Sequence, residues 1–230
     1  MLFQQNFQHL SGLNDQQRDA VLCRSDLVFV SAGPGTGKTH MLTSKLLDYI
    51  VSSGCPQRIV ALSYTNTAAR QIGERFEKKV VQCGVKQDFS FYNGTIHSFC
   101  FKMMKSFGDS FDYTILDDEE LIELASDIVA QTPQDIQQSA VMRCLRSDPK
   151  EVNTPLFRSV SQVKQSLKVI SIQDILSLFL HMLESNPEFR EWMKTQVTVM
   201  AVDEAQDLTE LNYLILDRLI EIVPGLKVFP

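Results

Sequence analysis

Residues 33–39 read Gly-Pro-Gly-Thr-Gly-Lys-Thr, a glycine-rich stretch of the phosphate-binding type G-x-x-x-x-G-K-[ST]. Glycines allow backbone N–H groups to turn toward phosphate oxygens, and a helix that begins at the end of such a loop adds its dipole. We expect the lysine to reach the β and γ phosphates and the last threonine to bind Mg²⁺. The sequence therefore predicts a site for ATP and Mg²⁺ at Gly33, Pro34, Gly35, Thr36, Gly37, Lys38 and Thr39.

The sequence around this loop alternates between apolar runs and helical patterns. Apolar runs typical of strands lie at residues 27–31 and 59–64, and residues 89–95 resemble a third strand. Helical patterns lie between and beside them, at residues 16–23, 38–51, 67–81 and 97–107. Alternation of strands and helices is typical of a parallel sheet in an α/β fold.

A long helical stretch interrupts this alternation. Residues 116–194 show apolar residues at helical spacing, as at Leu121, Leu124, Ala125 and Ile128, which indicates helices with a buried face. A strand-like run at 197–202, a helix at 208–222 and a last apolar run at 226–229 follow. We therefore expect residues 1–107 and 196–230 to form one domain and residues 108–195 a helical insertion subdomain.

An acidic cluster follows the apolar run at 197–202 directly. It reads Asp203-Glu204-Ala205-Gln206-Asp207. Because ligands bind at the carboxyl ends of parallel strands, the cluster and the phosphate loop can meet in space. We expect Asp203 to bind Mg²⁺ and Glu204 to act as general base for the attacking water. An Asp-Glu pair by itself is also typical of a helix amino terminus.

Polar residues at three other places are candidates for ligand contacts. Gln17 could read the edge of adenine, although Asn14 and Gln17 also match a plain capping box. Donors and an aromatic side chain end the second and third predicted strands, where single-stranded nucleic acid could bind. Singly, these residues are more typical of strand-end turns and helix caps, and only their joint placement favours a binding site. They are Tyr64, Thr65, Asn66, Thr95 and His97.

Bulk composition sets a few further expectations. The 230 residues are 44% hydrophobic and carry a net charge of −6. This charge does not itself indicate nucleic-acid binding, but it is compatible with a local basic groove. Five scattered cysteines suit reduced thiols. The sequence shows no apolar run long enough to span a membrane, so we expect a cytoplasmic protein.

The motifs together resemble a known family. In order they read Leu-Asn-Asp-Gln-Gln from Leu13, the phosphate loop, Ser-Tyr-Thr-Asn-Thr-Ala-Ala from Ser63, Gly-Thr-Ile-His-Ser-Phe from Gly94, and Val-Asp-Glu-Ala-Gln-Asp from Val202. This order resembles the UvrD/Rep/PcrA-like DNA helicases of superfamily I. The resemblance implies a RecA-like P-loop fold, with helices on both faces of the sheet, and an ATP-driven motor that moves 3′ to 5′ on single-stranded DNA.

The resemblance also implies roles for individual residues. Gln17 falls where the family reads adenine, and Gln206 where it links the γ phosphate to the DNA contacts. His40 stands where relatives often carry an arginine that packs near adenine, and we include it in the nucleotide site. Thr65, Asn66, Thr95 and His97 fall on motifs that touch DNA.

Two departures bear on activity. Thr67 replaces a common lysine, which removes one charge that could hold DNA. The sequence stops at Pro230, where the resemblance expects a further Gly-Asp-x-x-Gln-Ser motif and a second RecA-like domain with arginines that act on the γ phosphate. We therefore expect ATP binding but little unwinding by this chain alone. The alternatives are a stand-alone nucleotide-dependent interaction module, or the motor part of a helicase–nuclease or phage-defence complex.

Overall fold

The computed structural model describes residues 7–33, 35–53, 57–108, 111–132, 136–147 and 154–229. Its elements follow one another as η1 (Phe7–Leu10), α1 (Asp15–Leu22), α2 (Lys38–Ser52), β1 (Gln57–Ser63), α3 (Asn66–Cys83), β2 (Phe89–Thr95), α4 (Ile96–Ser106), β3 (Thr114–Ile115), α5 (Asp118–Gln131), α6 (Gln138–Arg146), α7 (Pro155–Leu167), β4 (Val169–Ile170), α8 (Asp174–Ser185), α9 (Pro187–Met193), β5 (Val199–Val202), η2 (Ala205–Asp207), α10 (Glu210–Ile222) and β6 (Lys227–Phe229). In the part described, no helix has the length and apolar character needed to cross a membrane.

The chain forms two compact units. Unit 1 comprises Met1–Phe99 together with Arg190–Pro230, and unit 2 comprises Cys100–Phe189. Unit 1 is therefore built from both ends of the sequence, with unit 2 inserted between them. The subdomain boundaries at residues 107 and 195 stay a prediction about functional organisation.

A parallel sheet forms the centre of unit 1. Its strand order is β2-β1-β5-β6, and every neighbouring pair is parallel. Ser63, at the end of β1, lies opposite Thr95, at the end of β2. The carboxyl ends of the strands thus share one edge of the sheet. The α/β fold with a parallel sheet, expected from the alternating pattern, is confirmed.

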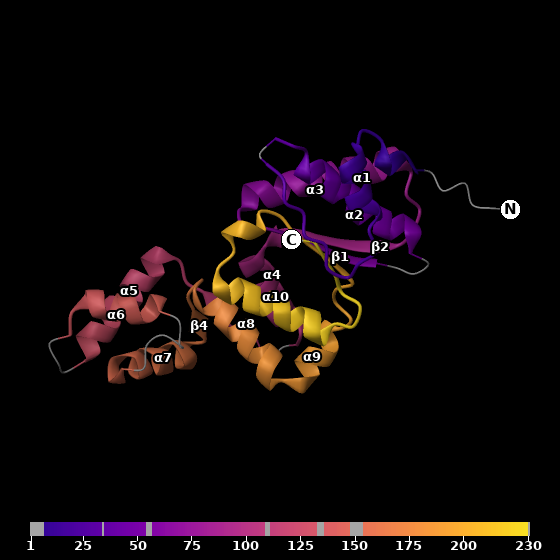
Figure 1. The fold of residues 1–230 in the computed structure, drawn as a ribbon. Helices are drawn as coiled ribbons and strands as arrows, with labels where there is room; N and C mark the ends of the chain where they lie inside the picture. Colours follow the sequence, from indigo (N-terminus) through magenta and orange to yellow (C-terminus); the bar gives the residue numbers. More distant parts are fainter. Residues whose placement is uncertain are drawn as a thin grey trace. The chain divides into compact units, whose positions relative to one another are not determined.

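Both faces of this sheet are covered, which explains why its central strands are apolar throughout. Ile59 and Ala61 of β1 pack with α2, α3 and alternate residues of β5 in one core cluster. Val60 and Leu62, which point to the other face, are also buried. Figure 1 shows α1, α2 and α3 on one side of the sheet and α10 on the other.

One predicted strand of this sheet is wrong. Residues 27–31, which precede the phosphate loop, form no strand beyond an isolated bridge at Leu27. β5 already pairs with β1 on one side and β6 on the other, so the run could join the described sheet only at an outer edge, beside β2 or three-residue β6. Leu27 and Phe29 accordingly keep 44% and 68% of their surface exposed.

Buried polar contacts attach the amino-terminal segment to α2. The Asp48 carboxylate accepts a hydrogen bond from His9 Nε2 (3.1 Å) and pairs with Arg24. Burial alone would raise the pKa of Asp48, but the bonds from His9 and Arg24 outweigh it and lower the pKa. Lys45, 1% exposed, donates to the Val21 carbonyl at the end of α1 (2.8 Å). These contacts fix α1 against α2, and with it the position of Gln17.

Unit 2 has a helical core of its own. Side chains of α5, α6 and α7 form one buried cluster, centred on residues such as Leu121, Val141 and Val160. α5 and α7 begin with side-chain caps, as at Asp117, whose carboxylate accepts from Glu120 N (2.9 Å). β3 and β4 add only a two-residue parallel pair. The insertion is thus helical, as predicted, apart from this short pair.

An ion pair lies inside unit 2 that the helical pattern did not predict. Lys164 of α7 and Asp174 of α8 pair, with side chains 10% and 7% exposed. Lys164 Nζ also donates to the Leu145 carbonyl (3.0 Å), and Asp174 accepts from the backbone N–H (2.6 Å) and hydroxyl (2.8 Å) of Ser171. The pair therefore connects α6, α7, β4 and α8.

Replacing Asp174 with Ala is expected to destabilise unit 2 strongly. The change leaves the Lys164 charge buried and unpaired, which typically costs about 3–5 kcal/mol. The matched control is Asp118→Ala, because the Asp118–Arg146 pair in the same unit is 2.6 Å long but exposed, with side chains 81% and 43% accessible. That pair is worth about 1 kcal/mol or less. Equal losses in urea unfolding of the two variants would contradict this assignment.

Candidate functional site

The phosphate loop takes the conformation that its glycines permit. Gly35 and Gly37 have φ angles of 75° and 85°, in the left-handed region that favours glycine. The Thr36 hydroxyl donates to the Gly33 carbonyl (2.8 Å). α2 begins at Lys38 without a side-chain cap, so its first N–H groups are available to an anion. Pro34 lies outside the described residues.

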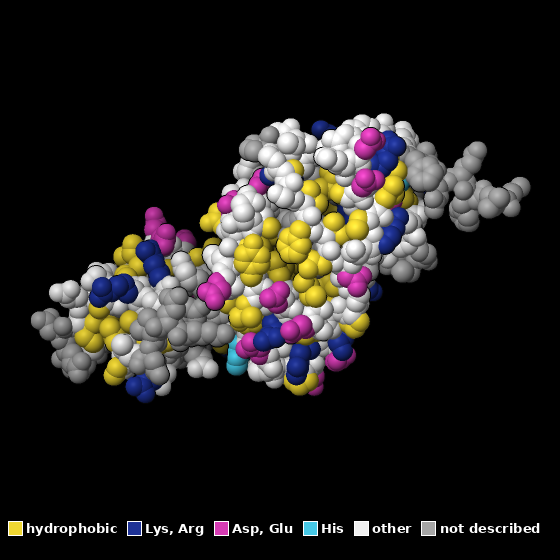
Figure 2. Space-filling model, viewed as in Figure 1, with side chains coloured by type: hydrophobic (Ala, Val, Ile, Leu, Met, Phe, Trp, Pro, Cys, Tyr) yellow, Lys and Arg dark blue, Asp and Glu magenta, His cyan; other side chains and the backbone are white. Residues whose placement is uncertain are grey.

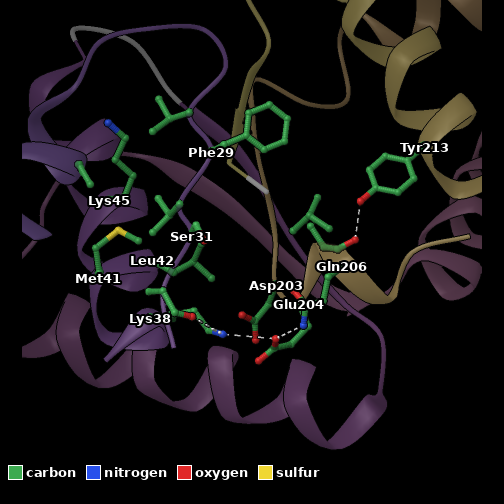
Figure 3. A pocket seen from close by; sticks show the side chains of 16 residues that line it. Phe29, Ser31, Lys38, Met41, Leu42, Lys45, Asp203, Glu204, Gln206 and Tyr213 are labelled. Carbon is green, nitrogen blue, oxygen red and sulfur yellow. Dashed lines mark hydrogen bonds and ion pairs between the residues drawn. The ribbon is translucent and has the colours of Figure 1, made fainter. Parts of the chain in front are cut away.

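Lys38 connects the loop to the acidic cluster. Its Nζ donates to the Ala32 carbonyl (3.3 Å) and lies 3.5 Å from Glu204 Oε2, 166 residues away in the sequence. Figure 3 shows Lys38 and Glu204 pointing toward each other, with Asp203 beside them. The structure thus brings together the two motifs from which the sequence predicted an ATP site.

The acidic cluster sits on a tightly held turn at the end of β5. Asp203 N donates to the Leu62 carbonyl of β1 (2.8 Å), which extends the strand ladder by one bond. Glu204 then has a φ of 53°, a conformation that is uncommon for a residue other than glycine. Tyr213 of α10 donates its hydroxyl to the Ala205 carbonyl (2.7 Å). This tyrosine was not predicted as part of the site, because no motif includes it and its spacing from Ala205 does not indicate a contact.

The surroundings of Asp203 and Glu204 shift the pKa values of these two carboxyl groups in opposite directions. Burial, and then the negative charge of Glu204, raise the pKa of Asp203 above its ordinary value. A hydrogen bond from Gln206 Nε2 to Glu204 Oε2 (2.5 Å), with Lys38 nearby, lowers the pKa of Glu204. Glu204 is therefore ionised at neutral pH, as a group that accepts a proton from water must be.

A cavity of about 640 Å³ lies over the loop and holds the groups that a nucleotide phosphate needs; we call it the phosphate pocket. The cavity is lined by residues of the loop, of α3 and of the acidic cluster. They are Ala32, Gly35, Gly37, Lys38, Thr39, Arg75, Glu204 and Gln206. A triphosphate would find backbone N–H groups, a lysine and a helix amino terminus in one place.

The residues beside this pocket suit Mg²⁺ bound together with ATP. Asp203 makes no ion pair within the described residues, and the Thr39 hydroxyl has no hydrogen-bond partner there. Mg²⁺ prefers such oxygen ligands and is commonly held by one or two carboxylates plus substrate phosphates. Within the same residues, no group of three or more His, Cys, Asp or Glu side chains is placed to hold an ion by itself. A metal that arrives with its phosphates fits this arrangement.

Gln17 is a cap and a loop contact at the same time. Its Oε1 accepts from Asn14 N (3.0 Å), and Asn14 Oδ1 accepts from Gln17 N (2.9 Å), which completes the capping box. Its Nε2 also donates to the Thr36 carbonyl (2.8 Å). The capping alternative is therefore present in the structure, and the contact with Thr36 places Gln17 at the loop. Its role in reading adenine stays a prediction.

His40 faces the amino-terminal segment and α3. Its Nε2 lies 3.4 Å from the Ser11 carbonyl, and its Nδ1 lies 3.4 Å from Lys79 Nζ. Burial, and then the charge of Lys79, lower the pKa of His40, so that the neutral imidazole is favoured. A neutral ring could stack on a base at this position.

A second cavity of about 310 Å³, the apolar pocket, lies next to the first. The two share Ala32, Lys38, Glu204 and Gln206. The apolar pocket is lined mainly by hydrophobic side chains, Phe29 and Tyr213 among them (Figure 3). Figure 2 shows hydrophobic side chains gathered on this face of unit 1, in the region that Figure 1 labels β1 and α10. This pocket lies where residues 27–31 run outside the sheet.

The candidate DNA contacts gather at the edge where β1 and β2 end. Tyr64 is 60% exposed, and Thr65 caps α3 by accepting from Ala68 N (3.1 Å). Asn66, the first residue of α3, is exposed. The Thr95 hydroxyl accepts from Ser98 N (3.2 Å), and burial lowers the pKa of half-buried His97. The structure thus brings all five residues to one edge, where two of them also serve as caps.

A close contact fixes the second half of this edge. A Cβ on Gly94 would lie 2.5 Å from Tyr92 Oη and 2.7 Å from Ser98 Oγ, closer than real contacts allow. The hydroxyl groups of Tyr92 and Ser98 are themselves 2.8 Å apart. A side chain in place of Gly94 would therefore displace the Tyr92 and Ser98 hydroxyl groups. Tyr92 and Ser98 were not predicted as part of this edge, because their contact forms in the space that a side chain at position 94 would fill.

Comparisons with known proteins show which family this chain resembles. A family model described as the UvrD/REP helicase N-terminal domain matches residues 13–165 and 146–224. A probable DNA helicase II homolog from Rickettsia felis is 28% identical over 242 residues, covering 93% of this chain and 36% of the relative. The ATP-dependent DNA helicase PcrA from Bacillus subtilis is 27% identical, covering 93% of this chain and 32% of the relative.

A eukaryotic relative matches a shorter part. The ATP-dependent DNA helicase SRS2 from Saccharomyces cerevisiae is 34% identical over 137 residues, which cover 57% of this chain and 12% of the relative. The chain thus spans about a third of the length of the bacterial relatives. The family model covers most of the chain, including the phosphate loop and the acidic cluster. This chain therefore belongs to the UvrD/REP helicase family, through the family's N-terminal domain.

Proposed function

We propose that this chain is the ATP-binding portion of an ATP-dependent DNA helicase or translocase that acts on single-stranded DNA in the 3′ to 5′ direction. The observation that carries the proposal is the contact between Lys38 and Glu204, which puts phosphate-binding and water-activating groups on one pocket. The helicase relatives support the reaction class, and the family resemblance supports the direction.

In this proposal, each residue of the phosphate pocket has one task. The loop N–H groups and Lys38 hold the β and γ phosphates, while Thr39 and Asp203 supply oxygen ligands for Mg²⁺. Mg²⁺, when bound, neutralises charge on the phosphates. Glu204 orients the attacking water and accepts its proton. Gln206 donates a hydrogen bond to Glu204, and its proposed role is to link the γ phosphate to the DNA contacts.

Single-stranded DNA is the proposed partner at the edge formed by Tyr64, Thr65, Asn66, Thr95 and His97. An exposed tyrosine offers a face on which a base can stack, and the polar groups around it suit phosphates and sugars. We further propose that the 230 residues alone turn ATP over slowly and unwind little, since in the family a second RecA-like domain contributes to the γ phosphate. A cytoplasmic location is part of the same proposal.

Lys38→Ala is expected to weaken Mg²⁺-dependent ATP binding by at least about tenfold, or 1.4 kcal/mol, because the variant loses the charge that faces the phosphates. Titration with a fluorescent ATP analogue measures this, with and without EDTA, and EDTA is expected to weaken binding to the unaltered chain. Lys86→Ala removes an exposed lysine that does not line the pocket and serves as control. Unchanged binding by Lys38→Ala would remove the basis of the ATP assignment.

Glu204→Gln is expected to separate binding from turnover. The amide keeps the shape of the side chain but accepts a proton poorly, so ATP hydrolysis should fall by about 10²-fold or more while ATP affinity stays within a few-fold. Phosphate release in the presence of single-stranded DNA provides the readout. Asp207→Asn, in the same turn but outside both pockets, is the control. If the two variants hydrolyse ATP equally fast, Glu204 is not the general base.

Tyr64→Ala is expected to weaken binding of single-stranded DNA by about 1–3 kcal/mol, the usual worth of one stacked base. Tyr64→Phe should bind nearly as well as the unaltered chain, because the ring face remains. Val81→Ala, which trims a side chain 80% exposed near the far end of α3, is the control. Fluorescence anisotropy with a labelled oligonucleotide decides: equal affinity of all three variants would exclude stacking on Tyr64.

A further inference from the structure

Arg75 is the cation of the phosphate pocket that the sequence motifs leave without a role. It lies on α3, is exposed, and lines this pocket together with Lys38, Thr39 and Glu204. Within the described residues, its guanidinium has no hydrogen bond and no ion pair. A free arginine directed at a site built for phosphates is a ready partner for an anion.

Other cations of the same helix are already engaged or point elsewhere. Arg70 pairs with Glu74 one turn along α3 (3.9 Å). Lys79 Nζ contacts Ser44 and donates to the His40 carbonyl (3.1 Å), which attaches α3 to α2. Lys78 is exposed and does not line either pocket. Arg75 therefore differs from Arg70 and Lys79 in lacking a partner, and from Lys78 in lining the phosphate pocket.

The charge of Arg75 affects the pKa of two groups near the phosphate pocket, Asp203 and His40. Burial raises the pKa of Asp203, and the positive charge of Arg75 acts against that rise. Burial lowers the pKa of His40, and Arg75 adds to that lowering. Its guanidinium thus acts electrostatically on the carboxylate at the end of β5 and on the imidazole at the start of α2.

We propose that Arg75 binds the γ phosphate of ATP and so gives this domain a second phosphate-binding cation beside Lys38. Glu204 and Gln206, which line the same pocket, mark the end where the attacking water must stand, and hence the γ end of the triphosphate. A guanidinium can bind two oxygens of one phosphate through parallel N–H groups. The site thereby distinguishes ATP from ADP. This inference rests on the proposed ATP-binding function.

The test compares two nucleotides and three variants. Mg²⁺ complexes of ADP and of a non-hydrolysable ATP analogue are titrated into the unaltered chain, Arg75→Ala, Arg75→Lys and the control Lys78→Ala, which makes the same charge change on the same helix. Arg75→Ala should bind the ATP analogue about tenfold or more weakly but ADP within about twofold, as expected for loss of one charge-assisted contact. Arg75→Lys should recover part of the loss, since it keeps the charge without the fork. Lys78→Ala should match the unaltered chain.

The outcomes separate this inference from the proposed function. If the unaltered chain binds both nucleotides and Arg75→Ala weakens them equally, or weakens neither, Arg75 does not contact the γ phosphate and the proposed function stands. If the unaltered chain binds neither nucleotide, the proposed function fails first. Thermal unfolding of each variant accompanies the titrations. A loss confined to the ATP analogue, in a variant that unfolds at the same temperature, cannot come from misfolding and supports the contact.

Discussion

The contact between Lys38 and Glu204 joins the phosphate loop to the acidic cluster, and it depends on the order of the strands in unit 1. The two residues come from parts of the chain that are 166 positions apart, and they meet because β5 pairs in parallel with β1 and ends beside the phosphate loop. The lysine stays close to its loop through the Ala32 carbonyl, and the glutamate is presented by a turn in a left-handed conformation. A bound triphosphate would compete with Glu204 for the same ammonium group. The pair therefore links phosphate binding to the position of the proposed general base.

α3 gives the second connection, between the sheet edge and the phosphate pocket. The helix begins at Asn66, beside the exposed Tyr64, and carries Arg75 at the pocket wall nine residues later. At 1.5 Å per residue, these two positions are about 13.5 Å apart along one helix axis. Lys79 then attaches the helix to α2 through Ser44 and His40. α3 thus carries residues of both the proposed DNA-binding edge and the proposed nucleotide site.

Local patterns made most of the fold and part of the site predictable. Apolar runs predicted β1 and β5 because strands covered on both faces lack polar positions, and the glycines of the loop predicted its turn. The strand at residues 27–31 was wrong because pairing depends on a neighbour, which a run of apolar residues does not reveal. Contacts between distant residues could not be predicted either. Lys164 with Asp174, and Tyr213 with Ala205, show no spacing that signals them.

The most direct test is an experimental structure of this chain with Mg²⁺ and a non-hydrolysable ATP analogue. The account predicts phosphates in the space bounded by Gly35, Gly37, Lys38 and Thr39, with Lys38 Nζ on a phosphate oxygen and no longer paired with Glu204. A nucleotide bound elsewhere, or one bound over the loop with the Lys38–Glu204 pair still intact, would contradict it.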